Sequence, residues 1–557
     1  MQNLNLKYVD ETFDENGLLT GFNLKFDENY NFGYDVIDAI AEAEPDRRAM
    51  LWTNEAGEEI TFTFGDMKRY SNKTANMLAS EGIGKGDVVM LVLKRHYQFW
   101  FSILACHKLG AIAVPATNQL QTKDFVYRFD AATVKAIIST ADDGLPQHIE
   151  EAEKKCPSLK KKFMAFGRKT ERDTCEVPEG WLPFDKLMEQ ASDELERRDV
   201  KALDPMLMYF TSGTTGYPKM VLHNATYSLG HLMTAKHWHN VDPDGLHFTL
   251  SDTGWGKAAW GKLYGQWLME AGVFVYDYNR FHPTDLLPLF AKYNISTFCA
   301  PPTMFRFFIR EDLSKYDLSS LKYATIAGEA LNPEVFNIFY KNTGIKLMEG
   351  FGQTETTCIV ANLRGMEPRP GSMGKPSPQF DVDIVDENGN SVPAGVTGEI
   401  VLRTDKRPQI GLFMGYYRAE DLTEKAWHDG IYHTGDTAWK DEDGYYWYVG
   451  RTDDIIKSSG YRIGPFEIES VLMEHPAVLE CAITGVPDPV RGQVVKATIV
   501  LTRDYTPSDE LKKELQDYVK KQTAPYKYPR VVEFVEELPK TISGKIRRNE
   551  IRQNDAN

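Results

Sequence analysis

Residues 211–219 read TSGTTGYPK and follow a short apolar run, LMYF, at 207–210. Glycines let backbone N–H groups approach an anion closely, and successive N–H groups can form a nest for phosphate oxygens. The hydroxyls add neutral donors, and the lysine adds a positive charge. In the P-loop, lysine follows the second conserved glycine directly, whereas here Tyr217 does. The string predicts a phosphate-binding loop, with a plain polar turn between strand and helix as the alternative. Its candidate binding residues are Thr211, Ser212, Gly213, Thr214, Thr215, Gly216 and Lys219.

Six stretches resemble, in order and spacing, the motifs of the adenylate-forming superfamily, which includes acyl-CoA synthetases, peptide-synthetase adenylation domains and luciferases. They are TSGTTGYPK, AGEAL (327–331), GFGQTET (350–356), YHTGD (432–436), GRTDDIIKSSGYRIGPFEIE (450–469) and PKTISGK (539–545). The resemblance spans nearly the whole chain and is strongest to medium-chain acyl-CoA synthetases. It implies an enzyme that activates a carboxylic acid with ATP as an acyl-AMP and transfers the acyl group to coenzyme A, releasing AMP and pyrophosphate.

The resemblance also implies roles for the nucleotide-binding residues. Glu355 would hold Mg²⁺, since a carboxylate suits a hard cation that keeps most of its waters, and Thr354 would contact the α-phosphate. Asp436 would accept hydrogen bonds from both ribose hydroxyls. Arg451 and Arg462 would contact the ribose and phosphates with permanently charged guanidinium groups. The other implied ATP or AMP contacts are Gly328, Glu329, Ala330, Gly350, Phe351, Gly352 and Gln353.

Lys545 matches the catalytic lysine of the superfamily. A cation there would offset the repulsion between an attacking carboxylate and the α-phosphate of ATP. Ser459, Gly460 and Tyr461 would line the coenzyme A channel, and Asp453 would be the hinge about which a small C-terminal domain rotates between the two half-reactions. Without the resemblance, these residues would be interpreted as a solvated turn and a solvated basic tail.

The stretch SDTGW at 251–255 resembles the acyl-pocket region of acetyl- and medium-chain acyl-CoA synthetases. Acetate-specific relatives have a tryptophan where Gly352 stands, and a buried tryptophan occupies about 150–250 Å², so Gly352 predicts room for a longer acid. Trp238, Trp255 or Trp260 could refill that room, and Lys257 could reach a polar group of the substrate or be solvated. We expect a short-to-medium-chain acid, branched acids included, with aromatic acids as the second choice. The implied pocket residues are Trp238, Trp255, Lys257 and Gly352.

Two rival functions remain. An adenylating enzyme that loads an aromatic or aliphatic acid onto a carrier-protein phosphopantetheine would share the first half-reaction. A non-catalytic adenylate-binding protein would be expected to have lost its charged residues. Those residues are all present: Lys219, Glu355, Asp436, Arg451, Arg462 and Lys545.

Composition narrows the remaining classes. A net charge of −16 argues against a general nucleic-acid binder, which needs basic stripes. Six cysteines without a C-x-x-C pair argue against a zinc site and favour a reducing compartment. The first residues lack the apolar core of a signal peptide, and no apolar run reaches the roughly 20 residues of a membrane span. We therefore expect a cytoplasmic enzyme of small molecules with no membrane span, and a homo-oligomer stays open.

The elements that would position these motifs alternate between strands and helices. Apolar runs of strand length occur at 88–93, 111–116, 135–140, 206–210, 272–277, 296–302 and 323–330. Helix-period segments separate most of them, which predicts a large doubly wound α/β body.

The pattern changes near residue 380. Alternating strands around a D-E-N-G turn predict a β-rich subdomain over about 380–450. Farther on, a small, mobile α+β domain is expected. Its elements would be a helix from Pro465, strands near 478–486 and 493–501, a helix at 508–522 and a strand at 530–535. The predicted domains are therefore 1–452 and 453–557.

Overall fold

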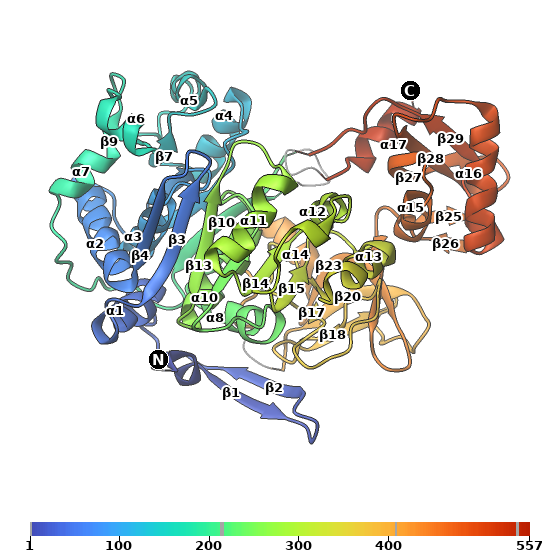
Figure 1. Cartoon of the computed structure of the whole chain (residues 1–557), viewed down its shortest axis with the longest axis horizontal. Coiled ribbons are helices and arrows are strands. Elements are labelled where there is room, and N and C mark those ends of the chain that lie inside the picture. The colour runs from blue at the N-terminus through green and yellow to red at the C-terminus, as the bar shows by residue number, and fades with distance from the viewer. Residues whose placement is uncertain (1–2, 212–216, 407–408, 460, 542–544, 557) are drawn as a thin grey trace.

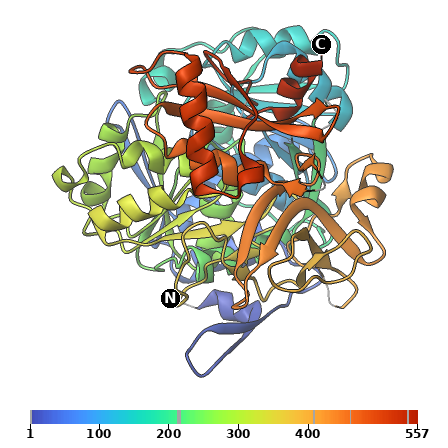
Figure 2. The ribbon, with the colours of Figure 1, turned by 90° about the vertical axis from the view of Figure 1, so that its right-hand side faces the viewer.

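The computed structural model describes residues 3–211, 217–406, 409–459, 461–541 and 545–556. A large α/β body carries a β-rich subdomain and a smaller C-terminal domain, which lies to one side of the body (Figure 1). Seen from that side, the C-terminal domain lies in front of the body and above the β-rich strands (Figure 2). The α/β class, with its large N-terminal part and smaller C-terminal part, agrees with the sequence prediction.

The first sheet of the body holds the phosphate-loop motif. Its strand β5 pairs in parallel with β6 on one side and with β7 on the other. The order of the strands along the chain therefore reverses direction at β5, as in a doubly wound sheet. Every residue of β5 is buried, as the continuous apolar run predicts. The strand order is β21 (Gly415–Tyr416), β11 (Lys219–Asn224), β10 (Pro205–Thr211), β6 (Ile112–Pro115), β5 (Val88–Val92), β7 (Ala136–Thr140), β8 (Lys161–Ala165) and β9 (Leu182–Pro183).

The phosphate-loop motif joins two antiparallel strands. Thr211 at the end of β10 is paired in register with Lys219 at the start of β11. The turn from strand to helix that the sequence offered as an alternative is therefore not what the fold contains. Residues Ser212 to Gly216 lie outside the described residues.

The second sheet of the body carries the AGEAL and GFGQTET motifs at the ends of β15 and β16. Its strands are β18 (Lys375–Pro376), β17 (Val360–Ala361), β16 (Leu347–Phe351), β15 (Tyr323–Ile326), β14 (Thr297–Ala300), β12 (Leu246–Thr249), β13 (Gly272–Asp277), β3 (Arg48–Asn54) and β4 (Glu59–Thr63). β12 to β16 and β3 run parallel to one another, whereas β4 and β17 pair antiparallel with β3 and β16. The motifs that follow β15 and β16 therefore emerge at one edge, where open α/β sheets bind ligands.

Helices connect most of these strands. The helix α2 begins with a capping box, in which Thr63 and Asp66 satisfy each other's backbone amides. The helices of the body are α1 (Ala39–Ala43), α2 (Phe64–Ser80), α3 (Gln98–Leu109), α4 (Thr122–Ala132), α5 (Leu145–Glu153), α6 (Lys169–Thr174), α7 (Phe184–Gln190), α8 (Tyr227–Met233), α9 (Gly256–Gly261), α10 (Tyr264–Leu268), α11 (Pro283–Tyr293), α12 (Pro302–Phe308) and α13 (Pro333–Thr343).

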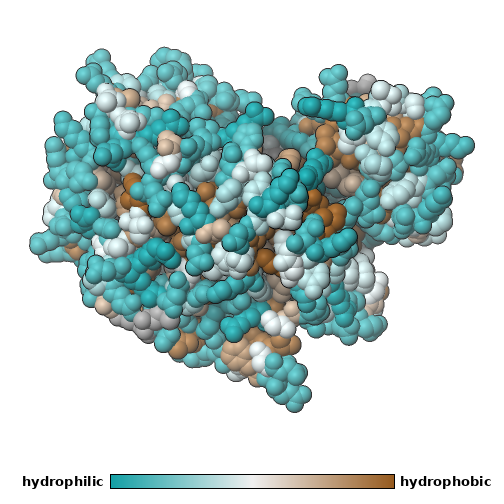
Figure 3. Space-filling view, viewed as in Figure 1, coloured by the Kyte–Doolittle hydropathy of each residue, from teal (hydrophilic) through white to brown (hydrophobic). Residues whose placement is uncertain are grey.

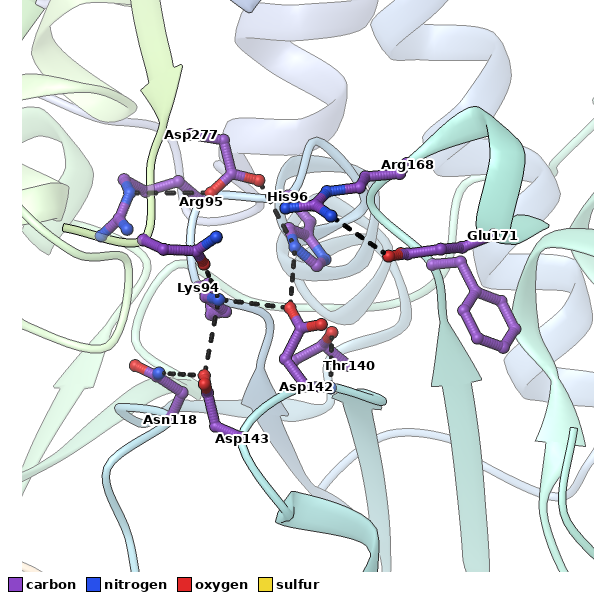
Figure 4. Close-up of polar contacts among 12 residues, drawn as sticks. Lys94, Arg95, His96, Asn118, Thr140, Asp142, Asp143, Arg168, Glu171 and Asp277 are labelled. Carbon is purple, nitrogen blue, oxygen red and sulfur yellow. Dashed lines mark hydrogen bonds and ion pairs between the residues drawn. The ribbon is translucent and has the colours of Figure 1, made fainter. Parts of the chain in front are cut away.

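A cluster of buried charges joins the two sheets (Figure 4). Lys94, after β5, donates to Asn279, after β13, at 2.9 Å and lies 3.2 Å from Asp142, after β7. His96 Nε2 lies 3.5 Å from Asp142 and 3.4 Å from Asp277 at the end of β13. Because these contacts connect strand ends of both sheets, they fix the relative position of the two halves of the body.

The β-rich subdomain carries the YHTGD motif. Its strands β19 and β20 pair antiparallel, and Asp386 between them accepts hydrogen bonds from the backbone amides of Asn388 and Asn390, as a D-E-N-G turn requires. Its elements are β19 (Val382–Val385), β20 (Gly398–Arg403), β23 (Ile431–Lys440), β22 (Trp427–His428), β24 (Tyr446–Arg451) and α14 (Glu420–Ala426).

The C-terminal domain packs α15, α16 and α17 on a separate sheet. Ile468 and Leu472 of α15 and Leu515 and Val519 of α16 are buried in its core. Its elements are β26 (Tyr461–Ile463), β25 (Ile456–Ser458), β28 (Gly492–Leu501), β27 (Val478–Asp488), β29 (Val531–Phe534), α15 (Pro465–Met473), α16 (Asp509–Gln522) and α17 (Arg548–Ala556). The step from β24 to β25 spans residues 452–455, where the domain boundary is predicted.

An N-terminal hairpin, which the sequence analysis did not predict, projects from the body beside the N-terminus (Figure 1). It pairs β1 (Val9–Phe13) with β2 (Leu19–Leu24). Glu11 fastens it to the body by contacts of 2.7 Å with Lys236 and 2.6 Å with His237.

Candidate active site

Asp436 lies at the centre of the site that the YHTGD motif predicts. The residue is 5% exposed and belongs to β23. Its carboxylate accepts hydrogen bonds from Tyr448 at 3.0 Å, from Arg451 at 3.2 Å and from Gln353. Burial raises the pKa of Asp436, whereas Arg451, Tyr448 and Gln353 act to lower it. The result is a fixed acceptor with cationic and neutral partners, as recognition of a diol requires.

Gly435 is required beside this carboxylate. Its φ is +70°, and a Cβ atom there would lie 2.7 Å from the Arg451 guanidinium. The same guanidinium donates to the Thr434 carbonyl at 3.0 Å. The glycine therefore lets Arg451 lie flat against the strand that bears Asp436.

Gln353 ties the GFGQTET motif to the YHTGD motif. Its side-chain amide donates to the Thr434 carbonyl at 2.8 Å, and its carbonyl oxygen accepts from the Tyr432 hydroxyl at 2.7 Å. Together with its bond to Asp436, these contacts use both ends of one amide. These hydrogen bonds hold the GFGQTET and YHTGD motifs, which are about 80 residues apart, in contact with each other.

Glu355 and Lys219 meet over the ring of Tyr416. The Tyr416 hydroxyl donates to Glu355 at 2.8 Å, and the Lys219 ammonium lies 4.8 Å from the centre of the ring. Burial lowers the pKa of Lys219, and the Glu355 charge opposes that shift. A carboxylate and a lysine thus stand together at the ends of the phosphate-loop motif.

The Thr354 backbone is held by a neutral histidine. His223 Nε2 lies 2.8 Å from the Thr354 carbonyl, so this nitrogen donates. Burial lowers the pKa of His223 to about 3, and its ring stacks on Tyr227 with 3.8 Å between centroids. His223 therefore fixes the catalytic segment without contributing charge.

Four residues of this site were not singled out from the sequence: His223, Tyr416, Tyr432 and Tyr448. His223 lies four residues after Lys219 on the same strand, so the sequence could have indicated that it lies near the phosphate-loop motif. The hydroxyls of Tyr416 and Tyr432 reach partners 61 and 79 residues away, which no local pattern signals. Tyr448 reaches Asp436 from the neighbouring strand, 12 residues along the chain.

The AGEAL strip follows β15 beside Lys257. Gly328 has a φ of +111°, and no heavy atom lies within 4 Å of a Cβ built there. Lys257 donates to the Ala327 carbonyl at 2.7 Å, and burial lowers the pKa of this lysine. The alternative of a solvated Lys257 is therefore wrong. Glu329 lies 3.1 Å from Thr303 and 3.5 Å from Arg306.

Trp260 fills the space beside Gly352. A Cβ atom on Gly352 would lie 2.5 Å from the Trp260 ring and 2.3 Å from the Thr357 carbonyl. Trp238 fills the corresponding space at Gly350, at 2.5 Å. The Trp260 ring therefore occupies the space beside Gly352, and the length of the acid stays a prediction. Trp255 is the residue before α9, and a Cβ on Gly256, the first residue of that helix, would lie 3.8 Å from the Thr354 hydroxyl.

The charge of Lys545, an exposed residue of the C-terminal domain, acts on two residues of this site. Burial raises the pKa of Asp436, and the Lys545 charge opposes that shift. Burial lowers the pKa of Lys257, and the Lys545 charge lowers it further. The predicted catalytic lysine thus lies within electrostatic range of the ribose carboxylate and of the AGEAL strip.

The predicted coenzyme A residues and one arginine lie apart from this cluster. Arg462 forms an ion pair with Glu387 in the turn after β19, so this structure does not place it with Asp436. Tyr461 is 50% exposed and stacks on Tyr526 at 4.0 Å. Ser459, with a φ of +50°, precedes Gly460, which lies outside the described residues.

On the face in Figure 3, hydrophilic side chains dominate, and hydrophobic ones gather in the middle of the face and toward the C-terminal domain. Within the described ranges, no three His, Cys, Asp or Glu side chains are grouped to hold a metal ion. In the same part of the chain, every helix is too short or too polar to cross a membrane.

Comparisons with known proteins agree with the motifs. The family described as AMP-binding enzyme matches residues 37–417, and the AMP-binding enzyme C-terminal domain matches residues 467–545. A mouse protein named acyl-coenzyme A synthetase ACSM3, mitochondrial, is 42% identical over 96% of this chain and 92% of its own length. Human acyl-coenzyme A synthetase ACSM5, mitochondrial, is 42% identical over 95% of this chain and 91% of its own.

Solved structures share the fold. The anthranilate CoA ligase AuaEII, in complex with anthranoyl-AMP, has a TM-score of 0.85 at 28% identity, covering 95% of this chain and 98% of that one. A Brucella canis acyl-CoA synthetase has a TM-score of 0.71 at 30% identity, covering 95% of this chain and 94% of that one.

Proposed function

The chain belongs to the family of AMP-binding enzymes, and we propose on that premise that it is an ATP-dependent acyl-CoA synthetase, an acid–thiol ligase. The observation that supports the proposal is the buried Asp436 carboxylate, which accepts hydrogen bonds from Tyr448, Arg451 and Gln353 and so joins three of the motifs in one preorganised acceptor. Lys545, an exposed lysine of the C-terminal domain, is proposed to supply the cation that transfer of a nucleotidyl group to a carboxylate requires.

In the first half-reaction, a carboxylate oxygen attacks the α-phosphorus of ATP, and the bond to pyrophosphate breaks. Asp436 orients the ribose, Lys219 and residues 211–216 bind the leaving phosphates, and Lys545 offsets the charge that builds up between acid and phosphate. The products are acyl-AMP and pyrophosphate. No protein nucleophile is needed, because the mixed anhydride is itself the activated species.

Glu355 fits the role of magnesium ligand. One of its oxygens accepts from Tyr416, and the carboxylate lies near Lys219 at the ends of the phosphate-loop motif. A single carboxylate suits Mg²⁺, which takes its other ligands from water and phosphates, and bound Mg²⁺ would neutralise phosphate charge.

In the second half-reaction, the coenzyme A thiolate attacks the acyl carbon and AMP leaves. Ser459, Gly460 and Tyr461 line the thiol's approach after the C-terminal domain, residues 453–557, rotates about Asp453. Tyr461 is 50% exposed and stacks on Tyr526 in this structure, apart from the Asp436 cluster, which fits a role in a second arrangement of the two domains. Arg462, now paired with Glu387, would reach the nucleotide only after such a movement.

The acid is of short-to-medium chain length, branched acids included. Trp260 and Trp238 occupy the positions beside Gly352 and Gly350, which shortens the pocket in comparison with one left open by both glycines. The names of the ACSM relatives support the medium-chain branch as the substrate class.

A panel of linear, branched and aromatic acids, assayed for pyrophosphate release with ATP and magnesium, tests the proposal. We expect release with acids of about three to eight carbons, the range that a pocket shortened by one or two buried tryptophans would hold. Absence of adenylate with every acid would reject it. Thioester formation with free coenzyme A separates this function from the loading of a carrier protein.

The compartment and the assembly stay predictions. The cytoplasm is the compartment proposed here, whereas the relatives named above are described as mitochondrial. Detection of the tagged chain in fractionated cells decides between the two.

A further inference from the structure

A buried cluster of charges lies next to the predicted hinge. Asp454, one residue after Asp453, has a side chain that is only 10% exposed. Its two oxygens contact Arg552 at 2.6 Å and Arg548 at 3.5 Å, both on α17. Arg548 in turn donates to both oxygens of Glu469 on α15 at 2.7 Å. We call these four residues the Asp454 cluster.

The cluster holds the segment that presents Lys545. Arg548 follows Lys545 by three residues. The loop before it is closed by a Thr541 amide that donates to the Lys545 carbonyl at 2.7 Å and by an Arg547 amide that donates to the Pro539 carbonyl at 2.8 Å. Because α17 begins at Arg548, fixing Arg548 fixes the base of the lysine loop.

The cluster also reaches toward the nucleotide wall. Burial and the charge of Asp436 raise the pKa of Tyr448, and the charge of Arg548 opposes that shift. The Tyr448 hydroxyl donates to Asp436 at 3.0 Å, and its ring packs edge-on against Phe466 of α15 at 6.0 Å. The Asp454 cluster is therefore linked to the Asp436 carboxylate through Tyr448, in the same arrangement in which the Lys545 charge acts on Asp436.

We propose that Asp454 is a positioning residue for the first half-reaction. Through Arg548 and Arg552 it holds the lysine loop at a fixed angle to the hinge, so that rotation about Asp453 delivers the Lys545 ammonium to the phosphate. Asp454 contacts neither substrate nor the reacting atoms. The inference rests on the proposed function and assigns a further residue to it.

The physical reason is the cost of misplacement. Loss of one partner from a buried ion pair leaves the remaining charges to seek new partners, which shifts the segments that carry them. A shift of about 1 Å in a catalytic group can lower a rate by about 10²-fold. The second half-reaction does not use Lys545, so the same shift should leave it nearly unchanged.

Asp454→Asn in the full chain tests the proposal. With the best acid of the panel, we expect the rate constant of acyl-AMP formation to fall by about 10- to 100-fold and the KM for ATP to change by less than about threefold. Thioester formation from supplied acyl-AMP and coenzyme A should stay within about twofold. Asp454→Glu, which keeps the charge, should recover part of the rate.

Asp555→Asn is the matched control. Asp555 is on the same helix and pairs with buried Lys496 of β28, so the substitution breaks a comparable ion pair away from the hinge. It should leave both half-reactions within about twofold. Arg552→Gln gives a second route if Asp454→Asn does not fold, because it removes the same contact from the partially exposed side.

Equal losses in both half-reactions, or equal effects of Asp454→Asn and Asp555→Asn on adenylation, would overturn the proposal. Failure of the proposed function looks different: the unaltered enzyme itself would then form no adenylate from any acid.

Discussion

At the scale of single residues, the proposed chemistry depends on Lys545. Its charge acts to lower the pKa of Asp436 and of Lys257, although 109 and 288 residues separate it from them. A cation on a separate domain could be withdrawn by moving that domain. We therefore propose that Lys545 acts in only one of the two half-reactions.

Lys545→Ala should slow acyl-AMP formation by about 10²–10³-fold, because removal of one preorganised charge from a developing transition state has that order of effect. Thioester formation from supplied acyl-AMP should be nearly intact. Rapid-quench measurement of each half-reaction checks this, and an equal decrease in both would contradict the assigned role.

Glu349 predicts a dependence of stability on pH. This buried carboxyl accepts from the Leu331 amide at 3.2 Å, and burial raises its pKa to about 8. In the unfolded chain it ionises near pH 4.5, so between about pH 4.5 and 8 the folded state holds a proton that the unfolded state has lost. The stability that the neutral carboxyl contributes is therefore complete below about pH 4.5 and decreases as pH rises toward 8.

Glu349→Gln keeps the acceptor for Leu331 and removes the ionisation. Its urea midpoint relative to the unaltered protein should rise steadily between pH 5 and pH 8, the interval set by the raised pKa. Glu367→Gln, at an exposed side chain, is the control and should give a flat difference. A flat difference for Glu349→Gln as well would show that the carboxyl is already ionised in the folded state.

Trp260 predicts a limit to the length of the acid. Trp260→Leu should shift the optimum of kcat/KM toward longer acids by about two carbons, because the indole occupies the space beside Gly352. Trp238→Leu provides a comparison at the neighbouring glycine. An unchanged optimum in both variants would mean that these rings do not border the acyl chain.

The charged site residues could be predicted from the sequence because each stands inside a motif of several residues. Asp436, Arg451, Lys219 and Glu355 are of this kind, and the structure groups them. Tyr416 and Tyr448 have no such local context, since each acts on a partner in another motif. Arg462 also lies inside a motif, but in this structure its side chain forms an ion pair with the exposed Glu387 and not with the other charged residues of the site.

At the scale of elements, continuous apolar runs predicted strands of the body well. Each of the seven runs overlaps a strand, from β5 to β15, because strands buried on both faces require such runs. The inner strands β3, β8, β11, β12 and β16, the edge strand β4 and the hairpin β1–β2 were not among the predicted runs. The strands β4, β1 and β2 alternate or carry charge, and only pairing with other strands determines that they are extended.

The connection between β24 and β25 is where the hinge is predicted. Asp453 lies in a four-residue step between two independent sheets and 3.8 Å from Arg451. Asp453→Pro fixes φ near −65° at this step and should hold the enzyme in one arrangement. One half-reaction should then fall by at least about tenfold and the other should persist, as measured with acid plus ATP and with acyl-AMP plus coenzyme A. Normal rates in both would place the hinge elsewhere.

At the scale of the whole molecule, two-domain organisation explains why the site is divided between the body and the C-terminal domain. The body provides a fixed nucleotide wall, built where two sheets and the β-rich subdomain meet. In the proposed mechanism, the C-terminal domain provides the positive charge for the first step, and Tyr461, which is half exposed here, belongs to the second step. The order of motifs in the sequence predicts this division, whereas the ion pairs that hold each domain together required the structure.

The tryptophans around the acyl pocket have an experimental consequence. Trp238 and Trp260 lie edge to face with 5.9 Å between ring centroids, at the positions that shorten the pocket. An acid that reaches them will alter their local polarity, so intrinsic fluorescence should report occupancy without any label. Subtracting the fluorescence of the Trp260→Phe variant from that of the unaltered protein separates the response of Trp260 from that of the other tryptophans. Binding of the acid could then be titrated by fluorescence without a label.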